Sequence, residues 1–210
     1  MIKDFDLLQR ANNDYTTIDL EHAEELAYRE LIDSIRYISL GDECGVMGNI
    51  ANIITYKGRF YIQEEQFDRV FIYDDTGRCL KKIDNKGRGP GEYLRIESID
   101  INTEKEELML VDGMSDKLFF YDLDGNFKSI HSIRYFQTEN TLCLRDSVFL
   151  HISAPSQNFG NEGLYGYALV LSKGNENFLK GYRYLPLQVG YKGGGQIFKG
   201  YERSCYHPIY

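Results

Sequence analysis

The sequence lacks several features that mark common classes of protein. Its 210 residues contain no tryptophan and only 4 prolines, and no apolar run approaches the ~18 residues that span a bilayer. Acidic residues outnumber basic ones by 32 to 24, so the formal net charge is −8, and no dense basic segment is present. This balance argues against binding to nucleic acid or to an anionic membrane surface. Residues 1–14 lack the apolar core of a secretion signal, so either the protein is cytoplasmic or a leader is missing from this chain.

The few cysteines and histidines form no recognisable motif. No CxxC pair is present, so structural zinc is not expected. Four cysteines allow three disulfide pairings, but a core of this size does not depend on disulfides, and we expect ordinary thiols. GxSxG and HExxH are absent. We therefore expect surface or packing roles for the four histidines. The alternative is that His131 or His151 lies close to acidic residues in the folded chain. These cysteines and histidines are Cys44, Cys79, Cys143, Cys205, His22, His131, His151 and His207.

The N-terminal region differs in pattern from the rest. Apolar residues recur at spacings of three and four through residues 18–35, which predicts an amphipathic helix over about 21–33. Asp19 is placed to cap it, and its apolar face is expected to pack on the rest of the protein rather than on a partner. Residues 35–40 (IRYISL) alternate as a strand does. We assign residues 1–40 to an N-terminal segment and residues 41–210 to a repetitive β region.

The β region contains a repeated four-strand unit. The alternation of apolar residues and the positions of turn residues predict the first unit at residues 50–56, 59–63, 69–73 and 78–83. The second unit is predicted at residues 98–101, 107–112, 118–121 and 127–130. Phe71-Ile72-Tyr73-Asp74 with Gly77 aligns with Phe119-Phe120-Tyr121-Asp122 with Gly125 at a constant offset of 48 residues. Four strands repeating every ~40 to 50 residues are typical of a β-propeller blade.

A third unit follows less clearly, and a fourth only begins. Strands are predicted at residues 141–144, 147–152 and 167–171, while residues 182–189 are either the next strand or a linker. The predicted fold is an all-β propeller of three to four four-stranded antiparallel blades after a short N-terminal helix. The blades are placed at about 49–84, 95–132 and 140–183, with a partial one at 184–210.

The connection between the first two units carries a family resemblance. Residues 86–93 (KGRGPGEY), followed by IDIN, LMLVD and FFYDLDGNF segments, resemble the NHL-type propeller repeat. More closely, they are similar to six-bladed β-propeller proteins of gut Bacteroidota, whose usual opening is also matched by residues 34–40 (SIRYISL). The resemblance implies a periplasmic or cell-surface protein with a ligand or partner on the face that carries the inter-blade loops.

The chain departs from that family in two respects. Family members are long enough for six blades and carry an export or lipoprotein leader, and this chain has neither. An open half-ring would expose two sheet edges, which propellers remove by closing. We therefore expect a fragment, or a ring completed by another copy of the chain or by another protein.

The glycine-rich connection is the first candidate site. Its three glycines could direct backbone amides toward an anion, but no Lys-Ser or Lys-Thr pair ends it and no helix follows, so it is not a P-loop. A tight connection in which Pro90 fixes a turn is the simpler interpretation. Arg88 and Glu92 then either line the central opening or form an ion pair.

Aromatic residues at loop ends are the second candidate site. Tyr93, Phe159 and Tyr165 could stack on sugar rings, although tryptophan, which usually leads such sites, is absent. The speculative ligand-binding set is therefore Arg88, Glu92, Tyr93, Phe159 and Tyr165, with no catalytic and no metal-binding residue assigned. The acidic turn at 122–125 (DLDG) suggests calcium, but its repetition at 74–77 favours a turn role.

The function expected from these patterns is a non-enzymatic ligand- or protein-binding module without a cofactor. Its partners would be a small ligand, a glycan or a protein, with no nucleic acid and no membrane span. One alternative is a propeller hydrolase or lyase with a metal or acid cluster in the central channel. The other is a truncated structural remnant without independent activity.

Overall fold

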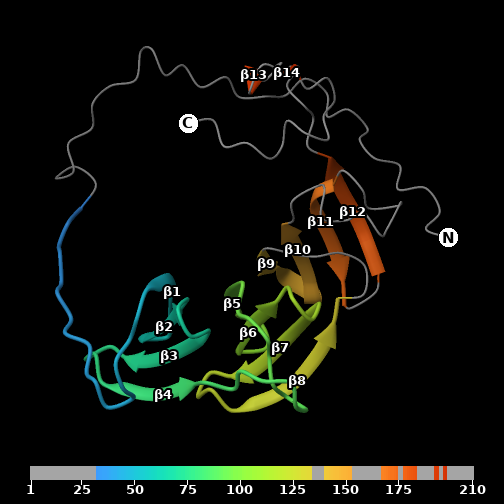
Figure 1. Cartoon of the computed structure of the whole chain (residues 1–210). Coiled ribbons are helices and arrows are strands. Elements are labelled where there is room, and N and C mark those ends of the chain that lie inside the picture. Colours follow the sequence, from blue (N-terminus) through green and yellow to red (C-terminus); the bar gives the residue numbers. More distant parts are fainter. Residues whose placement is uncertain are drawn as a thin grey trace.

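Three four-stranded antiparallel sheets make up most of the structure, a computed structural model that describes residues 32–133, 140–152, 167–174, 177–183, 192–193 and 196–197. The sheets lie side by side as blades, and in each the strands follow one another in chain order (Figure 1). This confirms the predicted all-β propeller architecture. The described part of the chain holds no α-helix, and so none that is long and apolar enough to cross a membrane.

The strand boundaries follow the repeat. Blade 1 consists of β1 (Ile50–Tyr56), β2 (Arg59–Glu64), β3 (Arg69–Asp74) and β4 (Cys79–Ile83). Blade 2 consists of β5 (Ser98–Asn102), β6 (Glu107–Asp112), β7 (Lys117–Asp122) and β8 (Phe127–Ser132). Blade 3 consists of β9 (Asn140–Cys143), β10 (Val148–Ile152), β11 (Tyr167–Lys173) and β12 (Asn177–Arg183), with a short 3-10 turn at Arg145–Ser147. A separate two-stranded sheet pairs β13 (Lys192–Gly193) with β14 (Gln196–Ile197).

The first strand of each blade is the inner one. β5 lies next to both β1 and β9, whereas β4, β8 and β12 lie at the outside (Figure 1). Because the strands alternate in direction, the β2–β3 turns and the inter-blade connections share one rim of the molecule. We call residues 65–68, 84–97 and 113–116 on this rim the connection face. The β1–β2 and β3–β4 turns and their equivalents form the opposite rim.

The hydrophobic core lies between the blades, and its residues follow the two-residue period of a strand. Each blade presents alternate residues to its two neighbours, so the central strands are buried on both faces. The core between blades 1 and 2 includes Tyr61, Val70, Ile72, Leu108, Leu110, Phe119 and Tyr121. The core between blades 2 and 3 includes Met109, Val111, Leu118, Phe120, Phe149 and Val170.

Two assignments near the ends of the described chain need correction. Residues 35–40 are not a strand in the described structure, because they form no ladder with a neighbouring strand. β12 was not predicted over Asn177–Arg183, since its sequence (NFLKGYR) has weak alternation of the kind common in outer strands. The predicted helix lies outside the described residues up to residue 31, and Ile32 and Asp33 are not helical.

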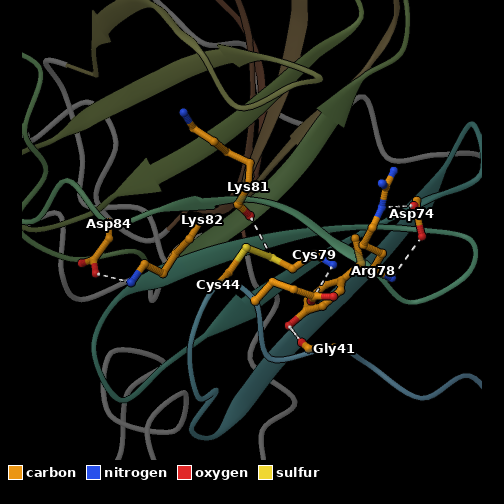
Figure 2. The surroundings of a disulfide bond; sticks show 10 residues. Gly41, Cys44, Asp74, Arg78, Cys79, Lys81, Lys82 and Asp84 are labelled. Carbon is orange, nitrogen blue, oxygen red and sulfur yellow. Dashed lines mark hydrogen bonds and ion pairs between the residues drawn. A yellow bond between two sulfur atoms is a disulfide. The ribbon is translucent and has the colours of Figure 1, made fainter.

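Two cysteines form a disulfide, against the expectation of ordinary thiols. Cys44 and Cys79 are 35 residues apart in sequence and their Cα atoms are 6.0 Å apart (Figure 2). Residues 41–48 fold over the outer part of blade 1, where Cys44 and Met47 pack on buried side chains of β2 and β3. Cys143 is a free thiol, and burial raises its pKa to about 12.

Candidate functional site

The connection between β4 and β5 is held in one shape by its own backbone. Lys86 and Tyr93 form an isolated bridge, in which the Gly87 amide donates to the Tyr93 carbonyl at 2.9 Å. The Tyr93 amide in turn donates to the Asn85 carbonyl at 3.1 Å. The loop is therefore a rigid element of the connection face.

Tyr93 anchors this loop in the core. Its ring is fully buried and packs edge-on against Phe119. Its hydroxyl donates to the Asp68 carbonyl at 2.8 Å and accepts the Asn85 amide at 3.1 Å. Burial raises the pKa of this hydroxyl well above its usual value. Tyr93 thus shapes the site and presents no ring surface on which a sugar could stack.

Glu92 closes the glycine turn. Its carboxylate accepts the Gly89 amide at 2.7 Å, and a Cβ on Gly87 would overlap the same carboxylate. The acid therefore explains the glycines on the preceding residues, and it does not pair with Arg88. Arg88 is exposed and takes part in no hydrogen bond or ion pair within the part of the chain that the structure describes.

Side chains from the two neighbouring turns tie the connection face together. Lys86 forms an ion pair with Asp68, whose other carboxylate oxygen accepts the Ile96 amide at 3.1 Å. On the other side, the Leu94 amide donates to the Asp112 carboxylate at 2.7 Å. The turn at 65–68, the connection and the turn at 113–116 consequently form one preorganised surface.

Two exposed apolar residues project from this surface, and sequence reasoning did not select them. Phe67 is 51 % exposed and Met114 is 64 % exposed. The guanidinium of Arg69 lies 4.5 Å from the centre of the Phe67 ring and also bonds to the buried Glu64 carboxylate at 3.0 Å. Phe67 is therefore held on one side by a cation whose own charge is paired.

The repeat contains the signal that would have identified these turns. Glu64 and Asp68 recur 48 residues later as Asp112 and Asp116, at the same places in blade 2. Asp68 and Asp116 have φ angles of 56° and 53°, in the left-handed region that few side chains adopt. Each of these two turns thus has an acidic residue at either end, and the residues between them include an exposed apolar side chain, Phe67 in one turn and Met114 in the other.

The acidic turns on the opposite rim have a structural role. Asp74 accepts the Thr76 hydroxyl at 2.6 Å and the Arg78 amide at 3.0 Å. These bonds, led by that of Thr76, lower the pKa of Asp74 to about 2. Asp122 makes the matching bonds to Asp124 and Asn126. Among the described residues, no group of three or more His, Cys, Asp or Glu could hold a metal ion.

In the described part of the chain, polar groups of the inner strands and the buried histidine are hydrogen-bonded within and between blades 2 and 3. Asp100 on β5 accepts the Cys143 amide at 2.6 Å and so joins blades 2 and 3. His151 lies 2.8 Å from Ser172 Oγ and 2.9 Å from Thr141 Oγ1, in the core between the same blades. Burial lowers the pKa of His151 to about 4. His131 is partly buried against Phe120.

Of the five residues selected from sequence, Arg88, Glu92 and Tyr93 lie on or under the connection face. Phe159 and Tyr165 lie outside the described residues.

A family model for a domain of unknown function, DUF4934, matches residues 15–206. The chain belongs to the DUF4934 family. No curated protein matches the sequence.

Solved structures similar to this DUF4934 chain have propeller folds or come from Bacteroides. A putative exported protein from Bacteroides fragilis is 20 % identical with a TM-score of 0.64, over 75 % of this chain and 44 % of that one. A protein of unknown function from Bacteroides caccae is 11 % identical with a TM-score of 0.46, over 63 % and 48 %. The WD40 repeats of RRP9 are 10 % identical with a TM-score of 0.45, over 64 % and 38 %. The DUF4934 chain thus spans less than half of each of these structures.

Proposed function

We propose that this DUF4934 chain is a non-enzymatic, protein-binding module of a six-bladed, NHL-like β-propeller that works outside the cytoplasm. The observation that carries the proposal is the connection face, where exposed Phe67, Met114 and Arg88 stand on a backbone fixed by hydrogen bonds.

The composition of this face supports binding to a protein. Phe, Met and Arg are enriched at protein interfaces, and a few such residues supply most of the binding energy. The neighbouring charges are satisfied within the face, since Lys86 pairs with Asp68 and Arg69 pairs with Glu64. A partner would therefore cover few unpaired charges, and the fixed loop would lose little conformational entropy on binding.

The inner strands offer little for catalysis, which supports the non-enzymatic assignment over the hydrolase or lyase. The sequences of β1 and β9 contain no acid and no histidine, and the carboxylate of Asp100 on β5 already bonds to the Cys143 amide. A propeller fold alone does not decide between binding and catalysis, so the argument rests on these residues.

The disulfide and the Bacteroides fragilis neighbour support a location outside the cytoplasm. Disulfides persist in oxidising compartments and are rare in the cytosol. The neighbour is described as a putative exported protein. The six blades rest on the resemblance of the KGRGPGEY connection and its repeat to the Bacteroidota propellers.

The test uses a random peptide library displayed on phage and panned against the full chain. Enriched peptides are synthesised and their affinities measured by calorimetry. We expect Phe67→Ala and Arg88→Ala each to weaken binding by about tenfold or more, because interface anchors of these types typically cost over ~1.4 kcal/mol when truncated. The melting temperature of both variants should stay near that of the original chain.

Matched controls lie away from the connection face. Arg78→Ala removes an exposed arginine from the opposite rim, and Leu80→Ala removes an exposed apolar side chain from the outer strand β4. Both should leave peptide binding unchanged. If no peptide is enriched, or if the control variants weaken binding as much as the test variants, the connection face is not the binding surface.

A further inference from the structure

The Phe67 ring is held in one orientation although half of its surface is exposed. The Phe67 amide donates to the buried Glu64 carboxylate at 3.2 Å, so the residue is fixed by its backbone. The Arg69 guanidinium, which bonds to the same carboxylate, lies over one face of the ring. The opposite face of the ring is therefore the part that a partner can reach, and we call it the free face of Phe67.

The cation on the covered face decides what the free face attracts. The face of an aromatic ring carries negative potential, which binds cations. In Phe67 this potential already faces Arg69, whose guanidinium contacts the ring while Glu64 pairs with it from elsewhere. A second cation would be repelled by Arg69 across the ring, whereas a second aromatic ring would stack in an offset or edge-on arrangement. The free face of Phe67 thus favours an aromatic side chain over Lys or Arg.

Met114 extends the same preference to the neighbouring turn. Its side chain is largely exposed, and a thioether makes favourable contacts with the edges of aromatic rings. The bond between the Leu94 amide and the Asp112 carboxylate holds this turn against the connection. Both exposed apolar side chains of the connection face therefore favour aromatic groups in a partner.

Arg88 is the cation of the connection face that a partner can use. Among the described residues of that face, Lys86 pairs with Asp68 and Arg95 pairs with Glu97 at 3.3 Å, whereas Arg88 has no partner. The residues on either side of Arg88 are glycines, so no adjacent side chain covers it. A free guanidinium binds a carboxylate through two parallel hydrogen bonds.

The charges around Phe67 restrict where the carboxylate of a partner can lie. Asp68 follows Phe67 in sequence and pairs with Lys86, which stands two residues before Arg88, so the ring and the free cation belong to adjoining segments. Glu65 begins the same turn, is exposed, and pairs with no side chain in the described part of the chain. Its charge repels a carboxylate from the turn, and Arg88 attracts one to the connection.

We propose that the connection face binds a segment of another protein that places an aromatic side chain on the free face of Phe67 and an Asp or Glu carboxylate on Arg88. The inference rests on the proposed function and adds the chemistry of the partner. Because hydrogen bonds fix the backbone on which both residues stand, the partner must present its ring and its carboxylate together. This requirement makes the face selective among exposed protein segments.

The test pans three peptide libraries displayed on phage against the full chain. Each library has random flanks around one fixed central residue, which is Trp, Leu or Arg. We expect the Trp library to be enriched about tenfold or more over the Arg library, with Asp or Glu over-represented in the flanks, because only the ring and the acid meet both anchors. The Leu library supplies an apolar anchor without a ring.

Double-mutant cycles then assign the two contacts. An enriched peptide is synthesised, and calorimetry compares its affinity for the original chain with that for the Phe67→Leu and Arg88→Gln variants. Replacing the tryptophan of the peptide by leucine should weaken binding to the original chain by about tenfold, but should have little effect on binding to Phe67→Leu, which already lacks the ring. Replacing the acid by its amide should show the same pattern with Arg88→Gln.

Matched controls remove the same types of side chain elsewhere. Tyr37→Leu removes an exposed ring from the N-terminal segment, and Arg78→Gln removes an exposed arginine from the opposite rim. Both should leave the affinities unchanged. Peptides that depend on Phe67 but bind equally well with Leu or Arg at the centre, or without an acid, overturn this inference and leave the proposed function standing. Enrichment from none of the three libraries overturns both.

Discussion

Gly77 lies against the main chain of Ser39 with no room for a side chain between them. A Cβ at residue 77 would overlap the Ser39 carbonyl oxygen. Gly77 also has a φ of 88°, in the left-handed region that glycine adopts without steric cost. One residue thus serves both the β3–β4 turn and the contact that holds the N-terminal segment on blade 1.

Gly77→Ala should lower the free energy of unfolding by about 2–4 kcal/mol. About 1–2 kcal/mol comes from forcing a side chain into the left-handed region, and the rest comes from displacing the backbone of Ser39. Urea denaturation measures the change. Gly58→Ala is the control, since Gly58 has a φ of 71° but open space around it, and it should cost only about 1–2 kcal/mol for the left-handed conformation. Equal costs would show that residues 38–39 do not pack against Gly77.

Tyr93→Phe should destabilise the protein by about 1–3 kcal/mol, because it leaves the part-buried Asn85 amide and the buried Asp68 carbonyl without their hydroxyl partner. The same denaturation experiment measures this loss. Tyr56→Phe removes only a 3.5 Å contact at an exposed position, so its effect should stay within about 0.5 kcal/mol. A neutral Tyr93→Phe would mean that the hydroxyl does not hold the connection in place.

The repeated strands were predictable from sequence because their signal is local. Alternating apolar residues and Asp-Gly turns recur at a fixed offset, and each core strand is specified by its own side chains. β12 was missed because an outer strand needs little apolar alternation. Residues 35–40 show the converse, since their alternation is strand-like but they pair with no strand in the described structure.

The candidate site was predictable only in part, because it depends on contacts between distant segments. The glycine-rich connection identified Arg88 and Glu92, but the burial of Tyr93 depends on Phe119, which lies 26 residues away in sequence on β7. Phe67 and Met114 have no motif of their own and were found through their exposure. The disulfide was unpredictable because it depends on how residues 41–48 fold over blade 1.

Reduction of the Cys44–Cys79 disulfide should lower the free energy of unfolding by about 3–4 kcal/mol. The bond closes a loop of 35 residues, and opening it enlarges the unfolded ensemble. Denaturation with and without a reducing agent measures the difference. Cys44→Ser with Cys79→Ser should show the same loss and no further response to reductant.

Cys143→Ser provides the control for this experiment. Cys143 is a free thiol, so the variant should keep the full sensitivity to reductant of the original chain. A Cys44→Ser, Cys79→Ser chain as stable as the oxidised protein would contradict a stabilising role for the bond.

Acid should destabilise the protein through His151, which is held neutral between blades 2 and 3. Burial lowers its pKa to about 4 in the folded state, against 6.5 for an exposed histidine. Between these values the unfolded chain binds a proton that the folded chain does not, so stability falls as the pH drops from 6.5 to 4. At ~1.4 kcal/mol per unit of pKa shift, this residue accounts for about 3 kcal/mol of the loss.

His151→Gln isolates this contribution, because glutamine keeps hydrogen-bonding groups near Thr141 and Ser172 but does not titrate. The variant is expected to be less stable than the original at neutral pH, with a difference that shrinks as the pH falls toward 4. His131→Gln is the control, since His131 is only partly buried, although burial lowers its pKa as well. Its effect on the pH dependence should be smaller than that of His151→Gln. Urea denaturation at a series of pH values measures both curves. Parallel curves for His151→Gln and the original chain would show that His151 takes up its proton equally in the folded and unfolded states. Burial between blades 2 and 3 would then not hold it neutral.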